Sequence, residues 1–195
     1  MPVFMSDILI NHIRKFTRLS DEEVPEVLSF FKETEVKKKE NLLTEGQICR
    51  YNYFVLQGIL RMFFVDEKGV EKTVQFGLEH WWLADYFSYQ RRQPSAFCIQ
   101  AVEASVIYSI DLQAQEQLLE RFPQMERYFR MVHQTAHAAS QMRLKFLYGF
   151  SREALYRQFS SSFPEFVQRI PQYLLASYLG ITPEYLSELR AKNIS

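Results

Sequence analysis

The sequence lacks most of the features that mark specialised protein classes. Its two cysteines, Cys49 and Cys98, have no CxxC-type spacing, so we expect both to pack as small apolar side chains in a reducing compartment. No apolar run approaches the roughly 18 residues that would predict a membrane-spanning helix. The N-terminal stretch carries charges throughout and has no small-residue cleavage site, so it does not resemble a signal peptide. These absences predict a cytoplasmic protein without a membrane partner.

Net charge is also missing, because 23 Lys and Arg balance 23 Asp and Glu. Bulk charge therefore predicts neither a nucleic-acid nor a membrane partner. From Arg143 onward, however, seven basic residues face four acidic ones, a mild bias that is compatible with a DNA-binding C-terminal part. A hydrophobic content of 47% with 15% aromatic residues predicts a folded globular chain.

Residues 172–191 have the pattern of a helix-turn-helix. Gly180 suits the left-handed end of a first helix, Thr182 is a good N-cap for the second, and Pro183 fits its first position. The apolar positions of the two helices are Leu175, Leu179, Ile181, Leu186 and Leu189. A corner of two helices with glycine in its turn can also be simple packing. The agreement of small, capping and apolar positions in one register favours DNA binding.

The hydrophobic period changes twice along the chain. Residues 6–32 predict two short helices, the second opened by a capping box of Ser20 and Glu23. Residues 41–111 are rich in aromatic and β-branched residues and are interrupted by Gly58, a turn at 66–69 and Gly77, which predicts an antiparallel barrel or sandwich. Helical spacing then returns, with Asp111 as the cap of one helix and Ser151 as the cap of another over 152–159.

Between these caps, Pro123 opens a predicted helix of roughly 25 residues, about 37 Å long. That length is comparable with the roughly 34–36 Å between adjacent half-sites on DNA. Its apolar and small residues step by threes and fours, which predicts a two-helix seam in a homodimer: Met125, Phe129, Val132, Ala136, Ala139, Arg143 and Phe146. The alternative is that this face packs on the protein's own barrel.

This order of helices, β-roll, long helix and helix-turn-helix resembles the Crp/Fnr family of bacterial transcription regulators. The stretch Tyr53–Arg61, YFVLQGILR, looks like the family element F-x-V-x-x-G-x-V-[KR]. The resemblance implies an α+β fold with an antiparallel cyclic-nucleotide-binding-like β-roll. It also implies a sensor domain at 1–122, a dimerisation helix at 123–150 and a DNA-binding domain at 151–195. The expected partners are double-stranded DNA and a second copy of the chain.

The phosphate cassette departs from the family pattern F-G-E-x-x-L followed by R-[ST]-A. Alanine replaces the glycine, aspartate replaces the glutamate, and Pro94 stands where the family has its arginine. The degenerate cassette consists of Ala84, Asp85, Arg91, Arg92, Ser95 and Ala96. Without the bidentate cation we expect no tight binding of cyclic AMP. The surrounding aromatic residues can shape a pocket for another effector or fill the old one.

No cofactor or metal is expected. Cysteine clusters for iron–sulfur binding and a haem constellation are absent, and His133 and His137 lack a third ligand. An enzyme on a cupin-like barrel is disfavoured, because His80 is the only histidine between Asn41 and Asp111.

The expected DNA reader lacks the arginines that the family often carries at the positions of Pro183 and Glu188. The resemblance assigns base reading to Glu184 and phosphate contacts to basic residues. The full expected interface is Thr182, Glu184, Tyr185, Ser187, Glu188, Arg190, Lys192 and Arg169. Residues 192–195 are too few for the β-hairpin wing that many relatives carry. The competing interpretation is therefore a small-molecule-binding or interaction protein that has lost DNA binding.

Overall fold

The computed structural model describes residues 5–192, which form two compact units. Unit 1 contains the described residues up to Phe64 together with Gln75–Gln134. Unit 2 contains Val65–Val74 and the described residues from Thr135. Within residues 5–192, no helix has the length and apolar character needed to cross a membrane.

Unit 1 begins with two short helices, α1 (Met5–Arg14) and α2 (Val24–Ser29). The expected capping box forms only in part. The Ser20 backbone N–H donates to Glu23 Oε2 at 2.8 Å, yet the helix starts after Glu23 and ends before Phe31. The prediction of a longer second helix was therefore wrong, because residues 21–23 form a turn instead.

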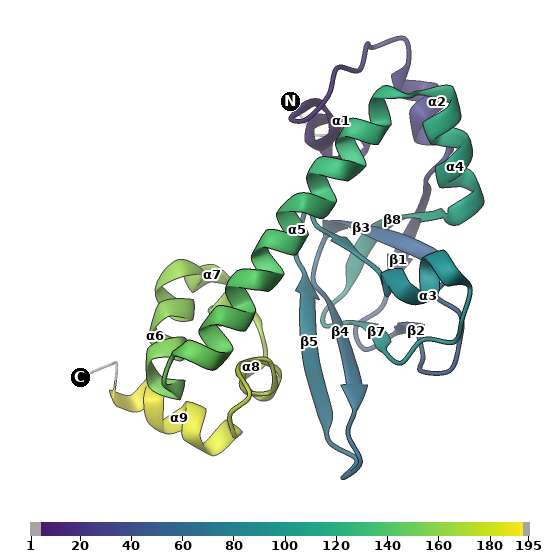
Figure 1. Ribbon diagram of the computed structural model, residues 1–195. Coiled ribbons are helices and arrows are strands. Elements are labelled where there is room, and N and C mark those ends of the chain that lie inside the picture. Colours follow the sequence, from purple (N-terminus) through teal and green to yellow (C-terminus); the bar gives the residue numbers. More distant parts are fainter. Residues whose placement is uncertain (1–4, 193–195) are drawn as a thin grey trace. The chain divides into compact units, whose positions relative to one another are not determined.

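The predicted antiparallel barrel is confirmed as two four-stranded sheets (Figure 1). One sheet has the order β1-β8-β3-β6 and the other β2-β7-β4-β5. The strands are β1 (Lys32–Val36), β2 (Asn41–Leu43), β3 (Tyr51–Gln57), β4 (Leu60–Val65), β5 (Glu71–Gly77), β6 (Trp82–Leu83), β7 (Cys98–Ala101) and β8 (Ser105–Asp111). The short β2 and β6, and the helix α3 (Tyr86–Arg91), were not predicted. Two or three residues are too few to show a strand period.

Gly58 joins β3 to β4 at a point where no side chain fits. Its φ is +95°, which favours glycine, and a Cβ there would lie 2.8 Å from the Ser105 backbone Cα. The glycine of the YFVLQGILR element therefore serves close packing between the β3–β4 connection and β8.

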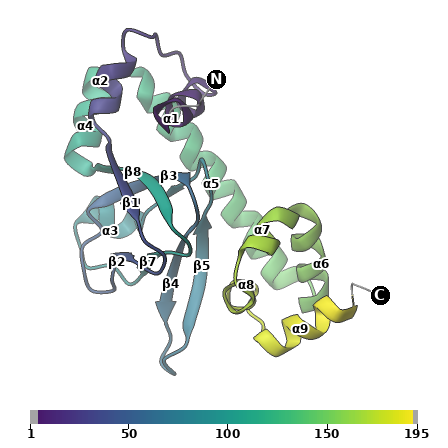
Figure 2. The same cartoon turned by 180° about the vertical axis from the view of Figure 1, so that it is seen from behind.

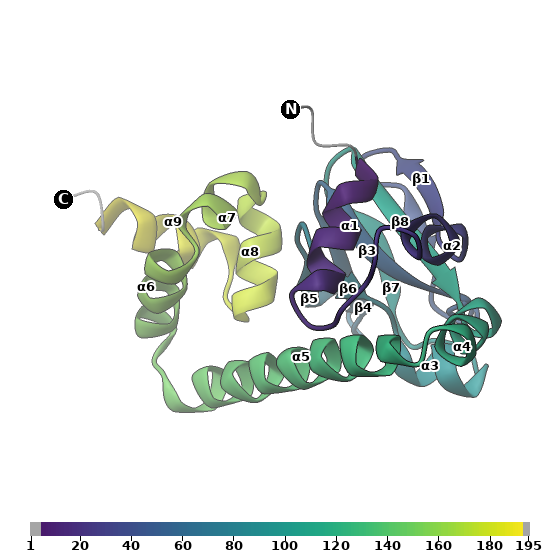
Figure 3. The ribbon, with the colours of Figure 1, turned by 90° about the horizontal axis from the view of Figure 1, so that it is seen from above.

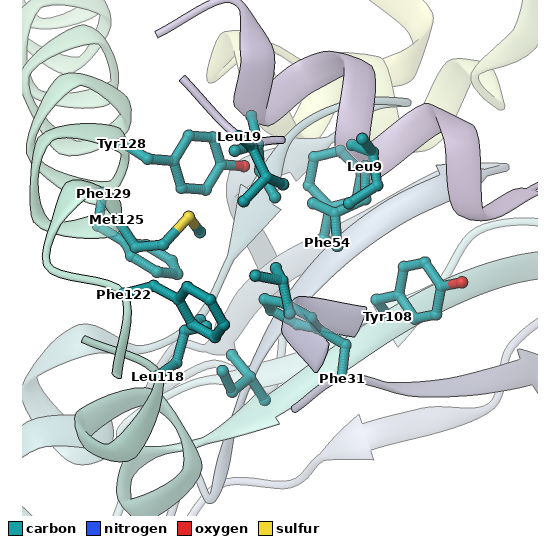
Figure 4. Packing of buried hydrophobic residues seen from close by; sticks show 14 of the residues in the cluster. Leu9, Leu19, Phe31, Phe54, Tyr108, Leu118, Phe122, Met125, Tyr128 and Phe129 are labelled. Atoms are coloured by element: carbon teal, nitrogen blue, oxygen red, sulfur yellow. The ribbon is translucent and has the colours of Figure 1, made fainter. Parts of the chain in front are cut away.

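Side chains fill the space between the sheets, and a second core lies under the helices. The first cluster includes Val55, Leu83, Ile99 and Ile107, all nearly or fully buried. The second joins α1 and α2 to β3 and β8 and to the helices that follow the roll (Figures 3 and 4).

Two helices follow the roll, α4 (Leu112–Arg121) and α5 (Gln124–Gly149). The Asp111 carboxylate caps α4 as predicted, by accepting from the Ala114 N–H. The start of α5 packs inward. Met125 is 0% exposed and Phe129 is 4% exposed, and both point into the second core (Figure 4). Val132 also packs against this core. Met125 and Phe129 therefore belong to the interior of unit 1 and are not exposed for the expected dimer seam, whereas Val132 is half-buried.

Unit 2 holds four further helices (Figure 2): α6 (Arg152–Ser162), α7 (Pro164–Arg169), α8 (Gln172–Leu179) and α9 (Pro183–Lys192). The Ser151 hydroxyl caps α6 as expected by accepting from the Ala154 N–H. The helix expected over 152–159 extends to Ser162, and Pro164 opens α7 at the helix position where a missing N–H costs nothing. The sequence pattern did not predict α7.

A buried polar chain ties α1 to α5 and β6. The Trp82 indole N–H donates to the Tyr128 oxygen at 2.8 Å, and that oxygen lies 2.9 Å from His12 Nδ1. Because Trp82 uses the oxygen as an acceptor, the Tyr128 hydroxyl can donate to a neutral His12. Burial lowers the pKa of His12 to about 4 and raises the pKa of Tyr128.

We expect His12 to make folding stability depend on pH. Since its pKa is about 4 in the folded chain and about 6.5 unfolded, the unfolded state binds more protons between these values. Stability should be complete above pH 6.5 and fall as pH drops toward 4. The ring is only partly buried, so the loss should be about 1–2 kcal/mol rather than the full shift.

Urea unfolding between pH 4 and 7 measures this. His12→Asn should flatten the pH dependence, whereas His137→Asn, on an exposed part of α5, should leave it unchanged. Equal slopes for the wild type and His12→Asn would contradict the assignment.

Candidate ligand cassette and nucleic-acid interface

The Asp85 carboxylate is enclosed by donors from its own chain. It caps α3, with Oδ1 accepting from the Phe87 and Ser88 N–H groups at 3.1 and 3.2 Å. Oδ2 accepts from the Ser95 hydroxyl at 2.7 Å. Asp85 is 6% exposed and Ser95 is 3% exposed. The two polar cassette residues therefore satisfy each other, and both lie below the surface.

The segment after α3 is closed by a second set of bonds. Ser88 accepts from the Cys49 N–H at 2.8 Å and donates to the Gln93 carbonyl at 2.6 Å. The Ser95 N–H donates to the Gln47 carbonyl at 2.8 Å. The bridging role of Ser88 was not predicted, because a single serine among aromatic residues does not show in the sequence that its side chain is buried.

The cassette arginines lie on the outside. Arg91 and Arg92 are exposed, and the Arg91 guanidinium lies 5.0 Å from the centroid of the Phe87 ring. Arg92 ends α3 in a left-handed conformation, with φ of +54°. Pro94, in the slot of the family's arginine, forms a β-bridge with Ile48. Ala96 is exposed and Ala84 is buried, so the six cassette residues do not converge on one surface.

The nearby aromatic residues divide between interior and surface. Tyr89 belongs to the cluster between the sheets, and Trp82 belongs to the core under the helices. Trp81 and Phe87 are 44% and 58% exposed. Of the two roles considered for these residues, filling the interior describes Tyr89 and Trp82.

The helix-turn-helix has the local geometry that its residues predict. Gly180 ends α8 with φ of +67°, and the Ile181 N–H returns to the Ala176 carbonyl at 3.0 Å. Thr182 Oγ1 accepts from the Tyr185 N–H at 3.2 Å and so caps α9. Leu186 and Leu189 are buried, which fixes the opposite side of α9 toward solvent.

The outward side of α9 is acidic. Glu184, Ser187 and Glu188 are exposed, and together with Pro183 and Ala191 they line a shallow surface. Tyr185 and Arg190 are half-buried, whereas Arg169, at the end of α7, is exposed. Lys192 is the last residue of α9. Residues 193–195, the rest of the stretch that was expected to be too short for a wing, lie outside the described residues.

Arg143 acts inside unit 2 rather than in an open seam. Its Nη2 donates to the Tyr178 carbonyl at 3.0 Å, and its guanidinium lies 3.9 Å from the Tyr178 ring centroid. Burial lowers its pKa. A second arginine, Arg152, donates from Nη1 to the Gly180 carbonyl at the turn. No role had been predicted for this residue. The expectation that Arg143 lies at a dimer seam conflicts with these contacts to α8.

Metal-ligating groups do not gather in the part of the chain that the structure covers. Among residues 5–192, no three His, Cys, Asp or Glu side chains are placed to hold an ion. His133 packs edge-on against the Tyr86 ring at 4.8 Å. Both cysteines are free and buried, as predicted, and burial raises the pKa of the Cys49 thiol.

Comparison with known proteins gives a domain family and a fold. Residues 33–122 match the cyclic nucleotide-binding domain family. FixK2 from Bradyrhizobium japonicum has 14% identity and a TM-score of 0.69, with 83% of each chain covered. CooA from Carboxydothermus hydrogenoformans has 18% identity and a TM-score of 0.69, covering 90% of this chain and 85% of that one. CLP of Xanthomonas campestris, described as a c-di-GMP responsive global regulator, has 12% identity and a TM-score of 0.70, covering 89% and 91%.

The TM-scores show a shared fold despite the low identities, and the resemblance to Crp/Fnr regulators is confirmed at the level of the fold. No curated protein matches the sequence.

We expect the cassette to act as a structural lock. Asp85→Ala should lower the free energy of unfolding by about 2–3 kcal/mol, because three buried or partly buried donors lose their acceptor. Ser95→Ala removes one donor to Asp85 and the acceptor of the Phe97 N–H, and should cost about 1–2 kcal/mol. Urea titration measures both.

Millimolar cyclic AMP should leave the midpoint of wild-type urea unfolding unchanged. A clear rise in this midpoint that Asp85→Ala abolishes would show that the Asp85 carboxylate binds the ligand.

Proposed function

Since the chain combines a cyclic nucleotide-binding domain with the Crp/Fnr fold, we propose that it is a dimeric, DNA-binding transcription regulator of that type. In this proposal it is cytoplasmic and not an enzyme. Residues 1–122 are the sensor domain, 123–150 the dimerisation helix and 151–195 the DNA-binding domain. The observation that carries the proposal is the capped turn from Gly180 to Thr182, from which α9 presents an exposed side.

On DNA, α9 would enter the major groove with its first turns against the bases. Glu184 lies in the first turn and is exposed, where a carboxylate can accept from cytosine N4. Ser187, one turn later, can contact a base or a phosphate. Thr182 and Tyr185 flank this side, and Arg190, Lys192 and Arg169 supply phosphate contacts.

The acidic side of α9 favours a second candidate function. Glu188 would face the DNA backbone with a like charge, which weakens binding. An interaction or small-molecule-binding protein that has lost DNA binding would tolerate this residue. The two candidates differ in whether the outward side of α9 meets a polyanion.

We infer that dimerisation uses the exposed part of α5. Residues 134–142 are all exposed, on every side of the helix. Ala136 and Ala139 of the expected seam lie here, while Phe146 is half-buried. A free line of small and apolar side chains runs along Ala136, Ser140, Leu144 and Leu147, at spacings of four, four and three. The Ser140 hydroxyl donates to the Ala136 carbonyl at 2.9 Å, so its polar group is satisfied within the helix. We assign the dimer contact to this line.

Regulation would be a shift between two arrangements of the paired α5 helices that changes the spacing of the recognition helices. An effector contributes only through different affinities for the two arrangements. The closed cassette supports an effector other than cyclic AMP, or a constitutive regulator.

Binding to DNA is tested by selecting genomic fragments on the purified full-length protein and measuring gel shifts with the enriched sequence. Glu184→Ala should relax base preference, whereas Lys192→Ala should weaken all sequences alike and reduce the slope of log affinity against log salt by about 1. Glu188→Gln should raise affinity for all sequences. Identical behaviour of the first two variants would contradict the division of roles. The absence of an enriched palindrome, with no gain from Glu188→Gln, would favour the second candidate.

The dimer contact is tested by sedimentation equilibrium. Leu144→Glu places a charge on the free line and should weaken association by tenfold or more, since an unpaired charge at an interface is costly. Lys145→Glu changes charge on the neighbouring, exposed residue off this line and should have little effect. A monomeric wild-type protein, or equal effects of the two variants, would refute the assignment.

A further inference from the structure

A hollow of about 440 Å³ lies in unit 1 between β2 and β3. Its apolar walls are Leu42, Leu43 and Ile48. Leu43 is 3% exposed and belongs to the cluster between the sheets, so the base of the hollow borders the interior of the roll. Ile48, at 39% exposure, lies at its edge. This volume lies within the usual range for small-molecule sites, roughly 300–1,000 Å³.

Two tyrosines form one wall. The Tyr51 and Tyr53 rings are 6.2 Å apart between centroids and inclined by 46°. Tyr53 is 5% exposed, whereas Tyr51 is 38% exposed. Because the two rings are inclined and Tyr53 is buried, only the partly exposed Tyr51 ring offers a face on which another ring can stack.

The polar groups of the hollow are mainly free donors. Arg50 is exposed and forms no hydrogen bond or ion pair with the described residues. Gln47 Oε1 already accepts from the Thr44 N–H at 3.3 Å, which leaves the Gln47 amide N–H groups available. The Tyr53 hydroxyl donates to the Leu42 carbonyl at 3.2 Å, so it is held in place at the wall. A cation with an amide donor favours an anionic ligand.

We propose that this hollow binds a small planar aromatic carboxylate. Its ring stacks on Tyr51, and its carboxylate pairs with Arg50, assisted by Gln47. None of the lining residues belongs to the cassette, although Gln47 and Ile48 are backbone neighbours of Ser95 and Pro94. If the chain is a regulator, such an acid is its effector; binding itself does not depend on whether the chain binds DNA.

Isothermal titration of the full chain tests this with named probes. Indole-3-acetate and 4-hydroxybenzoate are the aromatic acids. Cyclohexanecarboxylate tests the need for an aromatic ring, inorganic phosphate tests the anion alone, phenyl phosphate tests a phosphate in place of the carboxylate, and cyclic AMP tests the cassette. Arg50→Gln and Tyr51→Ala alter the hollow, and both side chains are exposed enough that the fold should survive, which thermal unfolding checks. Arg92→Gln, an exposed arginine outside the hollow, is the matched control.

We expect at least one aromatic acid to bind at micromolar to millimolar concentration, and more tightly than cyclohexanecarboxylate, phosphate and phenyl phosphate. Arg50→Gln and Tyr51→Ala should each weaken it about tenfold or more, while Arg92→Gln leaves it unchanged. Binding of neither aromatic acid would overturn the proposal. Unchanged binding in both variants, equal binding of cyclohexanecarboxylate, or binding of cyclic AMP alone would also overturn it. Preference for phenyl phosphate would overturn the assignment to carboxylates.

Discussion

The hydrogen bonds to the Asp85 carboxylate hold α3 and the segment after it in one closed corner of the β-roll. A buried carboxylate must be fully paired, and here three donors from α3 and Ser95 provide the pairing. In the family that the chain resembles, the matching carboxylate meets a ligand. Here the carboxylate instead holds α3 and the following segment in place. The side chain of Pro94, in the slot of the family's arginine, offers no hydrogen-bond donor, so this corner lacks the cation that the family pattern supplies.

The long helix α5 has a buried first part and an exposed second part. This division explains why the sequence predicted the helix but not what its apolar face contacts. A spacing of threes and fours identifies an apolar face but not what covers it. At Met125 and Phe129 the cover is the chain's own α1, β3 and β8 core. At Arg143 it is Tyr178 of α8. From residue 134 onward most of the helix is exposed, with Arg143 and Phe146 half-buried. The line that we propose for the dimer contact lies in this exposed part and is rotated from the one that the sequence suggested.

Helix ends that are set by the residue at the end itself were predictable from the sequence. Asp111, Ser151, Gly180 and Thr182 each act as the cap or helix end that their residue type predicts. The longer strands show a clear change of composition, so the roll was recognisable. The failures were β2, β6, α3 and α7, which are six residues or shorter and depend on tertiary partners. The burial of Asp85 and Ser95 was not predictable either, since a motif gives residue types but not which donors they meet.

A closed cassette changes where a signal can enter the roll. Leu43 and Tyr53 line the hollow between β2 and β3 and also pack with Val55, Leu83 and Ile99 in the interior. Protein interiors are close-packed and change between discrete arrangements rather than by smooth deformation. Tyr53 is held by its bond to the Leu42 carbonyl, and it pairs with Leu83 across β3 and β6. Leu83 lies two residues before Asp85, and the Gln47 carbonyl, at the hollow, accepts from the Ser95 N–H. The hollow and the corner that Asp85 closes are therefore direct neighbours in the fold, and a ligand in the hollow would act on that corner from outside it.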